Sequence, residues 1–299
     1  MIAASSLWIL FTLLAAAGQS ARNAMQRELT AQLGTVGATH VRFLFGFPFA
    51  LVFLTGVLIV SGSALPQPGL AFWPWIALGA GSQIFSTALM LAAMNDRSFV
   101  VTIAYTKTEV IQAAVFGLFF LGDPLTFPIL VAIVIATAGV WLMSFKGGAP
   151  MQGGLRPTLL GLLSGAMLAL SANGYRGAIL SLEMPDFVLA ATFTLAVGLV
   201  LQSALLTIYL ALRDPAVLVA IARAWRPSLF AGFMGATASE FWFLAFALTS
   251  AANVRTLGLA EVLFAQAISY FIFKQATTPR EALGMTMIVA GVALLIWAQ

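Results

Sequence analysis

The sequence has 299 residues, of which 61% are hydrophobic and only 8% are charged, and its mean hydropathy is +1.02. So apolar a chain cannot cover itself with a water-facing surface, which excludes a soluble globular protein. The 14 lysines and arginines are scattered, which argues against nucleic-acid binding, and the absence of cysteine with a single histidine excludes thiolate and multi-histidine metal sites.

Hydropathy divides the chain into ten apolar stretches, each near the 20 residues or so that a membrane-spanning helix needs. The first begins close to Met1 and lacks the basic start and cleavage pattern of a signal peptide, so we expect it to be retained. Short turns rich in Pro, Gly and Asp separate the stretches. The sequence therefore predicts an all-α integral membrane protein with ten transmembrane helices, at residues 7–26, 37–61, 70–94, 99–121, 127–145, 157–181, 187–212, 227–248, 252–273 and 282–298.

The two halves of the chain resemble each other on either side of a long Gly-rich segment. A shift of 152 positions aligns Glu109 with Glu261, and a shift of 154 aligns Arg22 with Arg176. Because five helices per half is an odd number, the second half enters the membrane from the opposite side, as in the inverted repeats of secondary transporters. We predict two inverted five-helix repeats, covering residues 1–148 and 149–299.

Several ionisable side chains are expected inside the membrane, where each costs about 2.5–3.5 kcal/mol unless it has a partner or a wet cavity. Lys107 and Glu109 both fall in the fourth stretch and, two residues apart, point in different directions. We expect Lys107 to face a central cavity and Glu109 to be buried against a neighbouring helix. The expected partners are Arg22 or Arg42 for Glu109, and Arg176 or a nearby donor for Glu261. The alternative is that both glutamates are structural ion-pair members that lock helix packing.

Other polar and aromatic groups at depth complete a candidate site for a zwitterion, which needs an acceptor for its ammonium group and donors for its carboxylate. The candidate substrate-binding residues are Lys107, Tyr105, Gln83, Glu240, Trp242, Gln19, Asn173, Arg22 and Arg176, and those with a structural or coupling role are Glu109, Glu261, His40 and Arg42. The alternatives are interhelical hydrogen bonding for Tyr105 and Gln83, snorkelling to the interface for Arg22 and Arg42, and a plain polar position at a helix start for His40.

Two five-helix units, each with a Glu-Val pair in its fourth helix, a turn of the form "LGDPLT" and closing helices with "ATAGVWLM" and "VAGVALL", resemble the drug/metabolite transporter superfamily in its ten-helix EamA-type branch. The resemblance implies a central cavity and alternating-access export of small metabolites, commonly amino acids. It assigns motif positions to Glu109, Glu261, Thr126 and Thr278, although "KQATT" departs from the family's usual second turn. The YddG-like amino-acid exporters are a narrower alternative, but the fourth helix lacks their Asn-Tyr-Leu-Trp-Pro run.

We therefore expect a secondary transporter, and not an enzyme, that exports amino acids or related small metabolites from the plasma membrane as a multi-pass monomer. No cofactor, metal or nucleic-acid partner is expected beside the substrate and the lipid bilayer. A membrane-embedded enzyme and a channel are the alternatives. The first lacks a histidine pair, a cysteine or paired aspartates, and the second lacks a polar ring around a symmetric pore.

Basic residues concentrate in the odd-numbered loops, so the positive-inside rule puts both termini outside, whereas the family resemblance puts both inside.

Overall fold

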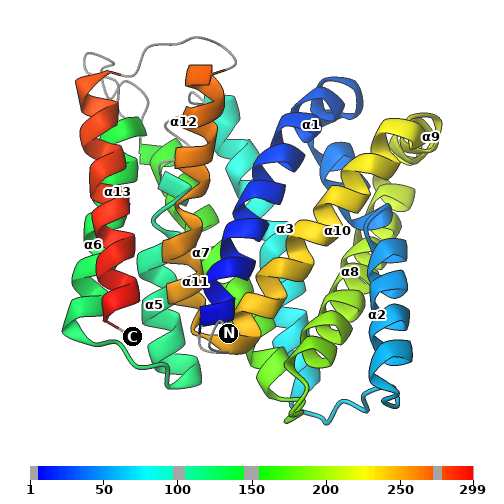
Figure 1. Ribbon diagram of the computed structural model, residues 1–299. Coiled ribbons are helices and arrows are strands. Elements are labelled where there is room, and N and C mark those ends of the chain that lie inside the picture. Colours follow the sequence, from blue (N-terminus) through cyan, green and yellow to red (C-terminus); the bar gives the residue numbers. More distant parts are fainter. Residues whose placement is uncertain (1–5, 97–104, 145–154, 272–277, 299) are drawn as a thin grey trace. The chain divides into compact units, whose positions relative to one another are not determined.

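The computed structural model describes residues 6–96, 105–144, 155–271 and 278–298 (Figure 1). Inside these ranges the side chains of residues 20–32, 35, 91, 94–96, 144, 265 and 268–271 are not described. The described residues form helices joined by turns, without a strand. Five helical segments among them are long and apolar enough to cross a membrane, namely Val36–Ser61, Leu155–Leu180, Phe187–Arg213, Trp225–Leu248 and Pro279–Trp297. The predicted all-α membrane fold is confirmed.

The chain forms two compact units, each built from two separate segments. Unit 1 comprises Met1–Gly81 and Gly174–Thr249, and unit 2 comprises Ser82–Asn173 and Ser250–Gln299. Each unit thus combines one segment from each half of the sequence. The helices α3, Phe72–Asp96, and α7, Leu155–Leu180, run from one unit into the other. The division into repeats at residues 148 and 149 stays a prediction.

Unit 1 is held together by close helix approaches at small residues. Helix α1 lies along α10, while α8 packs against α2 and α10. A Cβ atom on Gly232 would lie 2.5 Å from Cβ of Phe45, so no larger residue fits there without movement. Besides parts of α3 and α7, its helices are α1, Leu7–Leu44; α2, Phe47–Ser61; α8, Phe187–Arg213; α9, Pro215–Arg223; and α10, Trp225–Leu248.

Close helix approaches at small residues also hold unit 2 together. Helix α13 lies along α6, and α11 packs against α5. A Cβ atom on Gly139 would come within 2.6 Å of the Gly284 carbonyl oxygen, which shows how closely α6 and α13 approach. Besides parts of α3 and α7, its helices are α5, Glu109–Leu121; α6, Phe127–Ser144; α11, Ala251–Gly258; α12, Glu261–Phe271; and α13, Pro279–Trp297.

Three features differ from the predicted helix boundaries. Helix α1 continues through most of the predicted loop between the first two spans, but its backbone leaves the helical conformation at Gly34, whose φ of +66° suits a glycine. Helix α9 occupies a predicted loop, because nine residues are too few to register in a membrane-length hydropathy average. The predicted continuous helices at 99–121 and 252–273 are wrong, because turns at residues 107–108 and 259–260 interrupt them.

Candidate functional site

Two interrupted helices in unit 2 have the same backbone hydrogen bonds. Before α5, the N–H of Thr108 donates to the Tyr105 carbonyl at 3.2 Å, and before α12 the N–H of Ala260 donates to the Leu257 carbonyl at 3.0 Å. These positions differ by the same 152 residues that align the glutamates in the sequence. The next bonds match as well, since the amides of Ile111, Gln112, Leu263 and Phe264 donate to the corresponding Thr108 and Ala260 carbonyls.

Each break places a glutamate at the first residue of the helix that follows, Glu109 in α5 and Glu261 in α12. The first turn of a helix has amide N–H groups without intrahelical partners and carries a partial positive charge. A carboxylate at this position is therefore stabilised by the helix itself. The same logic explains why discontinuous helices form ion and substrate sites in membrane proteins.

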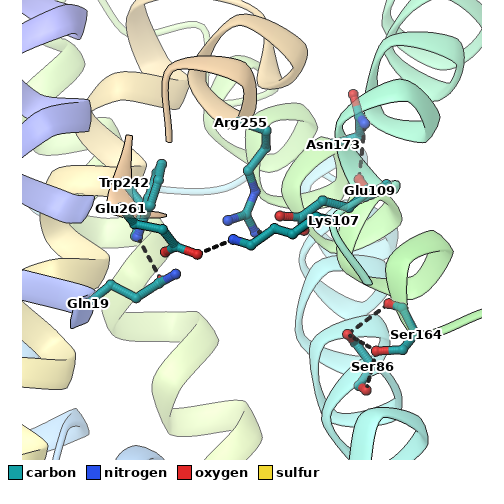
Figure 2. Close-up of polar contacts among 10 residues, drawn as sticks. Gln19, Ser86, Lys107, Glu109, Ser164, Asn173, Trp242, Arg255 and Glu261 are labelled. Atoms are coloured by element: carbon teal, nitrogen blue, oxygen red, sulfur yellow. Dashed lines mark hydrogen bonds and ion pairs between the residues drawn. The ribbon is translucent and has the colours of Figure 1, made fainter. Parts of the chain in front are cut away.

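Two ion pairs connect the two breaks, and we call them the crossed ion pairs. The Lys107 ammonium donates to Oε1 of Glu261, and the Arg255 guanidinium lies 3.9 Å from Oε2 of Glu109 (Figure 2). Lys107 lies in the first break and pairs with the carboxylate after the second, while Arg255, in the helix before the second break, pairs with the carboxylate after the first. The side chains of Glu109 and Arg255 are 3% and 10% exposed, and those of Lys107 and Glu261 are 11% and 14% exposed.

Helix α7 supports the first break through two glycines. A Cβ atom on Gly161 would lie 2.7 Å from Cβ of Tyr105, and one on Gly165 would lie 2.8 Å from the Thr106 carbonyl oxygen. The Tyr105 ring meets Trp141 of α6 edge-on at 6.0 Å. Tyr105 is therefore a packing residue that fixes the position of the turn carrying Lys107.

Asn173 and Gln83, two further predicted site residues, also lie in unit 2. Asn173 is fully buried and donates to the carbonyls of Ala113 at 3.1 Å and Ala169 at 3.0 Å, which ties α7 to α5 (Figure 2). Gln83 is half-buried on α3, one turn from the hydroxyl pair of Ser86 and Ser164 that joins α3 to α7. Asn173 therefore has the interhelical role that such groups often play in membranes.

Unit 1 contains a separate polar and aromatic group around the middle of α10. Glu240 accepts a hydrogen bond from the Thr192 hydroxyl of α8. The indole N–H of Trp242 donates to Oε1 of Gln19 on α1 at 3.2 Å (Figure 2). Beside them Phe241 stacks on Phe11 at a centroid distance of 6.2 Å. Trp242, one of the candidate substrate-binding residues, is thus 6% exposed and is held in place by a hydrogen bond.

Several of the described basic residues of unit 1 contact groups within the same unit. Arg176 donates to the carbonyls of Phe246, at 2.6 Å, and Thr249, which lie at the C-terminal end of α10 where carbonyls lack intrahelical partners. His40 is fully buried, and its Nε2 lies 3.0 Å from the Thr207 hydroxyl. Arg42 is half-buried, with its guanidinium 5.3 Å from the centroid of the Phe43 ring. The side chain of Arg22 lies outside the described residues.

The predicted ion-pair partners need correction. Glu261 pairs with Lys107, a nearby donor of the kind predicted beside Arg176, and Arg176 donates to carbonyls at the C-terminal end of α10. Glu109 pairs with Arg255, where Arg22 or Arg42 was expected. The Lys107 ammonium, expected to face a cavity, is engaged by Glu261.

Sequence reasoning missed Arg255 altogether. Arg255 is a charged residue inside the predicted ninth span. A charge inside a span is the same observation that made Lys107 a candidate site residue.

The crossed ion pairs combine cations and carboxylates at the ends of broken helices, and a small molecule that carries both charges can exchange for either member of a pair. Within the described ranges there is no group of three or more His, Asp or Glu side chains placed to hold a metal ion.

Comparison with known proteins agrees with this architecture. The model of the EamA-like transporter family matches residues 6–145. A crystal structure of a protein with 16% sequence identity has a TM-score of 0.76, over 99% of this chain and 97% of the other, which shows a shared fold. No curated protein matches the chain by sequence.

Proposed function

Since residues 6–145 match the model of the EamA-like transporter family, we propose that the chain is a transporter of this type and that it exports amino acids or related zwitterionic metabolites. The family match supports an integral membrane transporter. The substrate class, alternating access, the plasma membrane as its location and a monomeric state are the parts that we propose.

The observation that supports this substrate class is the crossed ion pairs of unit 2. Lys107 and Arg255 provide cations, Glu109 and Glu261 provide carboxylates, and all four lie around two helix breaks. A singly charged substrate would pair with only the cations or only the carboxylates. A fully apolar substrate would pair with neither. A zwitterion matches both.

The proposed binding step is an exchange of partners. The carboxylate of the substrate replaces Glu261 as the acceptor for the Lys107 ammonium, and the released Glu261 becomes an acceptor for the substrate ammonium. One charge-assisted hydrogen bond within the protein is replaced by two to the substrate, so the exchange leaves no unpaired charge in a poorly solvated place.

Counterflow in proteoliposomes tests the proposal. Vesicles preloaded with an unlabelled amino acid should accumulate the labelled form in a saturable way. We expect Lys107→Ala to lower the rate at least tenfold, because the carboxylate loses its charged donor, whereas Lys107→Arg keeps a donor and part of the activity. The control is Arg280→Gln, which removes an exposed arginine at the start of α13.

Two results would contradict the proposal at different points. Counterflow that is unchanged in Lys107→Ala would remove this residue from the substrate site. Counterflow of another metabolite class, with none for any amino acid, would show that the transporter assignment holds and the substrate class does not. Measuring with and without an imposed pH gradient separates proton exchange from facilitated flow, and light scattering of the purified protein tests the monomeric state.

A further inference from the structure

Helix α9 in unit 1 is unlike its neighbours, because it is short and connects two helices that are long enough to cross a membrane, α8 and α10. It packs against α8 and α1. Close to it α1 kinks at Gly34, just before the candidate span that starts at Val36, since a Cβ atom on Gly37 would lie 3.0 Å from the Val217 side chain of α9. A connection between two spanning helices emerges at the membrane surface, so we expect α9 at the level of the lipid headgroups. Figure 1 shows α9 between α8 and α10.

One side of α9 is anchored in the core of unit 1. Ile221 is 1% exposed and belongs to a cluster with Val41 of α1 and Leu210 of α8, against which Val217 and Leu218 also pack. These contacts fix the helix in position. Its remaining surface is therefore a stable feature of the fold.

A second side of α9 lines an open groove of about 580 Å³. The groove residues from α9 follow a helical stripe of Ala216, Val219, Ala220 and Arg223, and Leu33 of α1 contributes to the opposite wall. The described lining is apolar except for Arg223, which stands at one end and is exposed. An apolar trough that ends in a guanidinium suits a molecule with a hydrocarbon chain and an anionic head.

The sequence on both sides of α9 is basic. Arg213 precedes the helix and Arg226 follows it, both are exposed, and Asp214 is the only acidic residue between positions 213 and 226. Trp225 is 51% exposed, and the Arg226 guanidinium lies 5.4 Å from the centroid of its ring. Exposed tryptophan and arginine together are typical of the membrane interface, and arginine binds phosphate with two parallel hydrogen bonds.

We propose that this groove binds one anionic phospholipid, with an acyl chain along Leu33 and Val219 and the headgroup phosphate on Arg223. A soluble anion would make no use of the apolar walls, and a zwitterionic lipid, which carries no net charge, would gain less from Arg223 and from the basic residues that flank α9 in the sequence. The site lies apart from the crossed ion pairs in the sequence and has no role in the proposed transport step. It holds or fails independently of the substrate.

Thermal unfolding of the full-length protein in neutral detergent tests the site. Titration with phosphatidylglycerol should raise the Tm of the wild type as the site fills, while phosphatidylcholine at equal concentration should raise it much less. In Arg223→Gln, the apparent Kd for phosphatidylglycerol should weaken roughly tenfold or more, because a charge-assisted bond to phosphate is lost. Arg280→Gln, which removes an exposed arginine of unit 2, should bind like the wild type.

Three outcomes overturn the proposal. These are equal stabilisation by the two lipids, equal weakening by both arginine variants, and stabilisation by glycerol phosphate as strong as that by the lipid, which would mark a binder of soluble anions. If Arg223→Gln does not fold, Val219→Glu provides the second variant. It places a negative charge on a half-exposed groove residue and should abolish the preference for the anionic lipid.

Discussion

The coupling between Lys107 and Glu261 gives the sharpest test of the crossed ion pairs. Lys107→Met keeps the length of the side chain but removes its charge, which leaves the Glu261 carboxylate without the ammonium that it accepts from. Glu261→Gln removes the opposite charge. The double variant removes both, so no charge of this pair is left unpaired.

The expected magnitudes follow from burial. The two side chains are 11% and 14% exposed, so each single change isolates a largely buried charge, at a cost of about 3 kcal/mol, the lower end for broken buried pairs. Removing both partners avoids that penalty. We expect the double variant to cost no more than either single change, which is about 3 kcal/mol less than the sum of the two and at the upper end of the usual range for residues in direct contact.

The assay is thermal or denaturant unfolding of the four proteins in one detergent, with Arg280→Gln as an exposed-charge control expected within about 0.5 kcal/mol of the wild type. The single variants should lose on the order of 6 °C in Tm, at a few degrees per kcal/mol for a chain of this size. Strictly additive single and double changes would refute the pairing, because additivity means that the two side chains do not interact.

Two further predictions concern packing and helix capping. Gly161→Leu should destabilise unit 2 by several kcal/mol, because even a Cβ atom would lie 2.7 Å from Cβ of Tyr105. The control Gly56→Ala, where no atom lies within 4 Å of an added Cβ, should be neutral in the same unfolding measurement. Equal Tm values for the two variants would contradict the close approach. Asp186→Ala should cost about 1 kcal/mol, since its carboxylate accepts from the N–H groups of Val188 and Leu189 at the start of α8, and Asp186→Asn should recover most of this loss. A neutral alanine variant would show that the cap contributes nothing.

The candidate site was only partly predictable, and its glutamates show why. Glu109 and Glu261 stand out in sequence because charged residues in apolar stretches are expensive and because the repeat aligns them. The partners of these glutamates cannot be identified from the sequence, because Arg255 and Lys107 lie about 150 residues from the glutamates that they meet. Such pairings depend on how helices pack, which neither periodicity nor hydropathy encodes.

The sequence by itself determined that this is an all-helical membrane protein. Backbone amides in lipid must find their partners within each spanning segment, so long apolar stretches leave little choice but helices. The alignment of Glu109 with Glu261 could also be read from the sequence, and the repeat that it suggests stays a prediction. Composition and hydropathy reveal the helices, and comparison of the chain with itself reveals the alignment.

Only the tertiary structure decided where two of those helices break, and which charges meet there. A hydropathy average over about 20 residues cannot detect a two-residue turn such as 107–108 or 259–260. The turns matter because they start new helices at Glu109 and Glu261, where the helix dipole stabilises a carboxylate. A cation from the other break then completes each pair, and that arrangement exists only once the helices have packed.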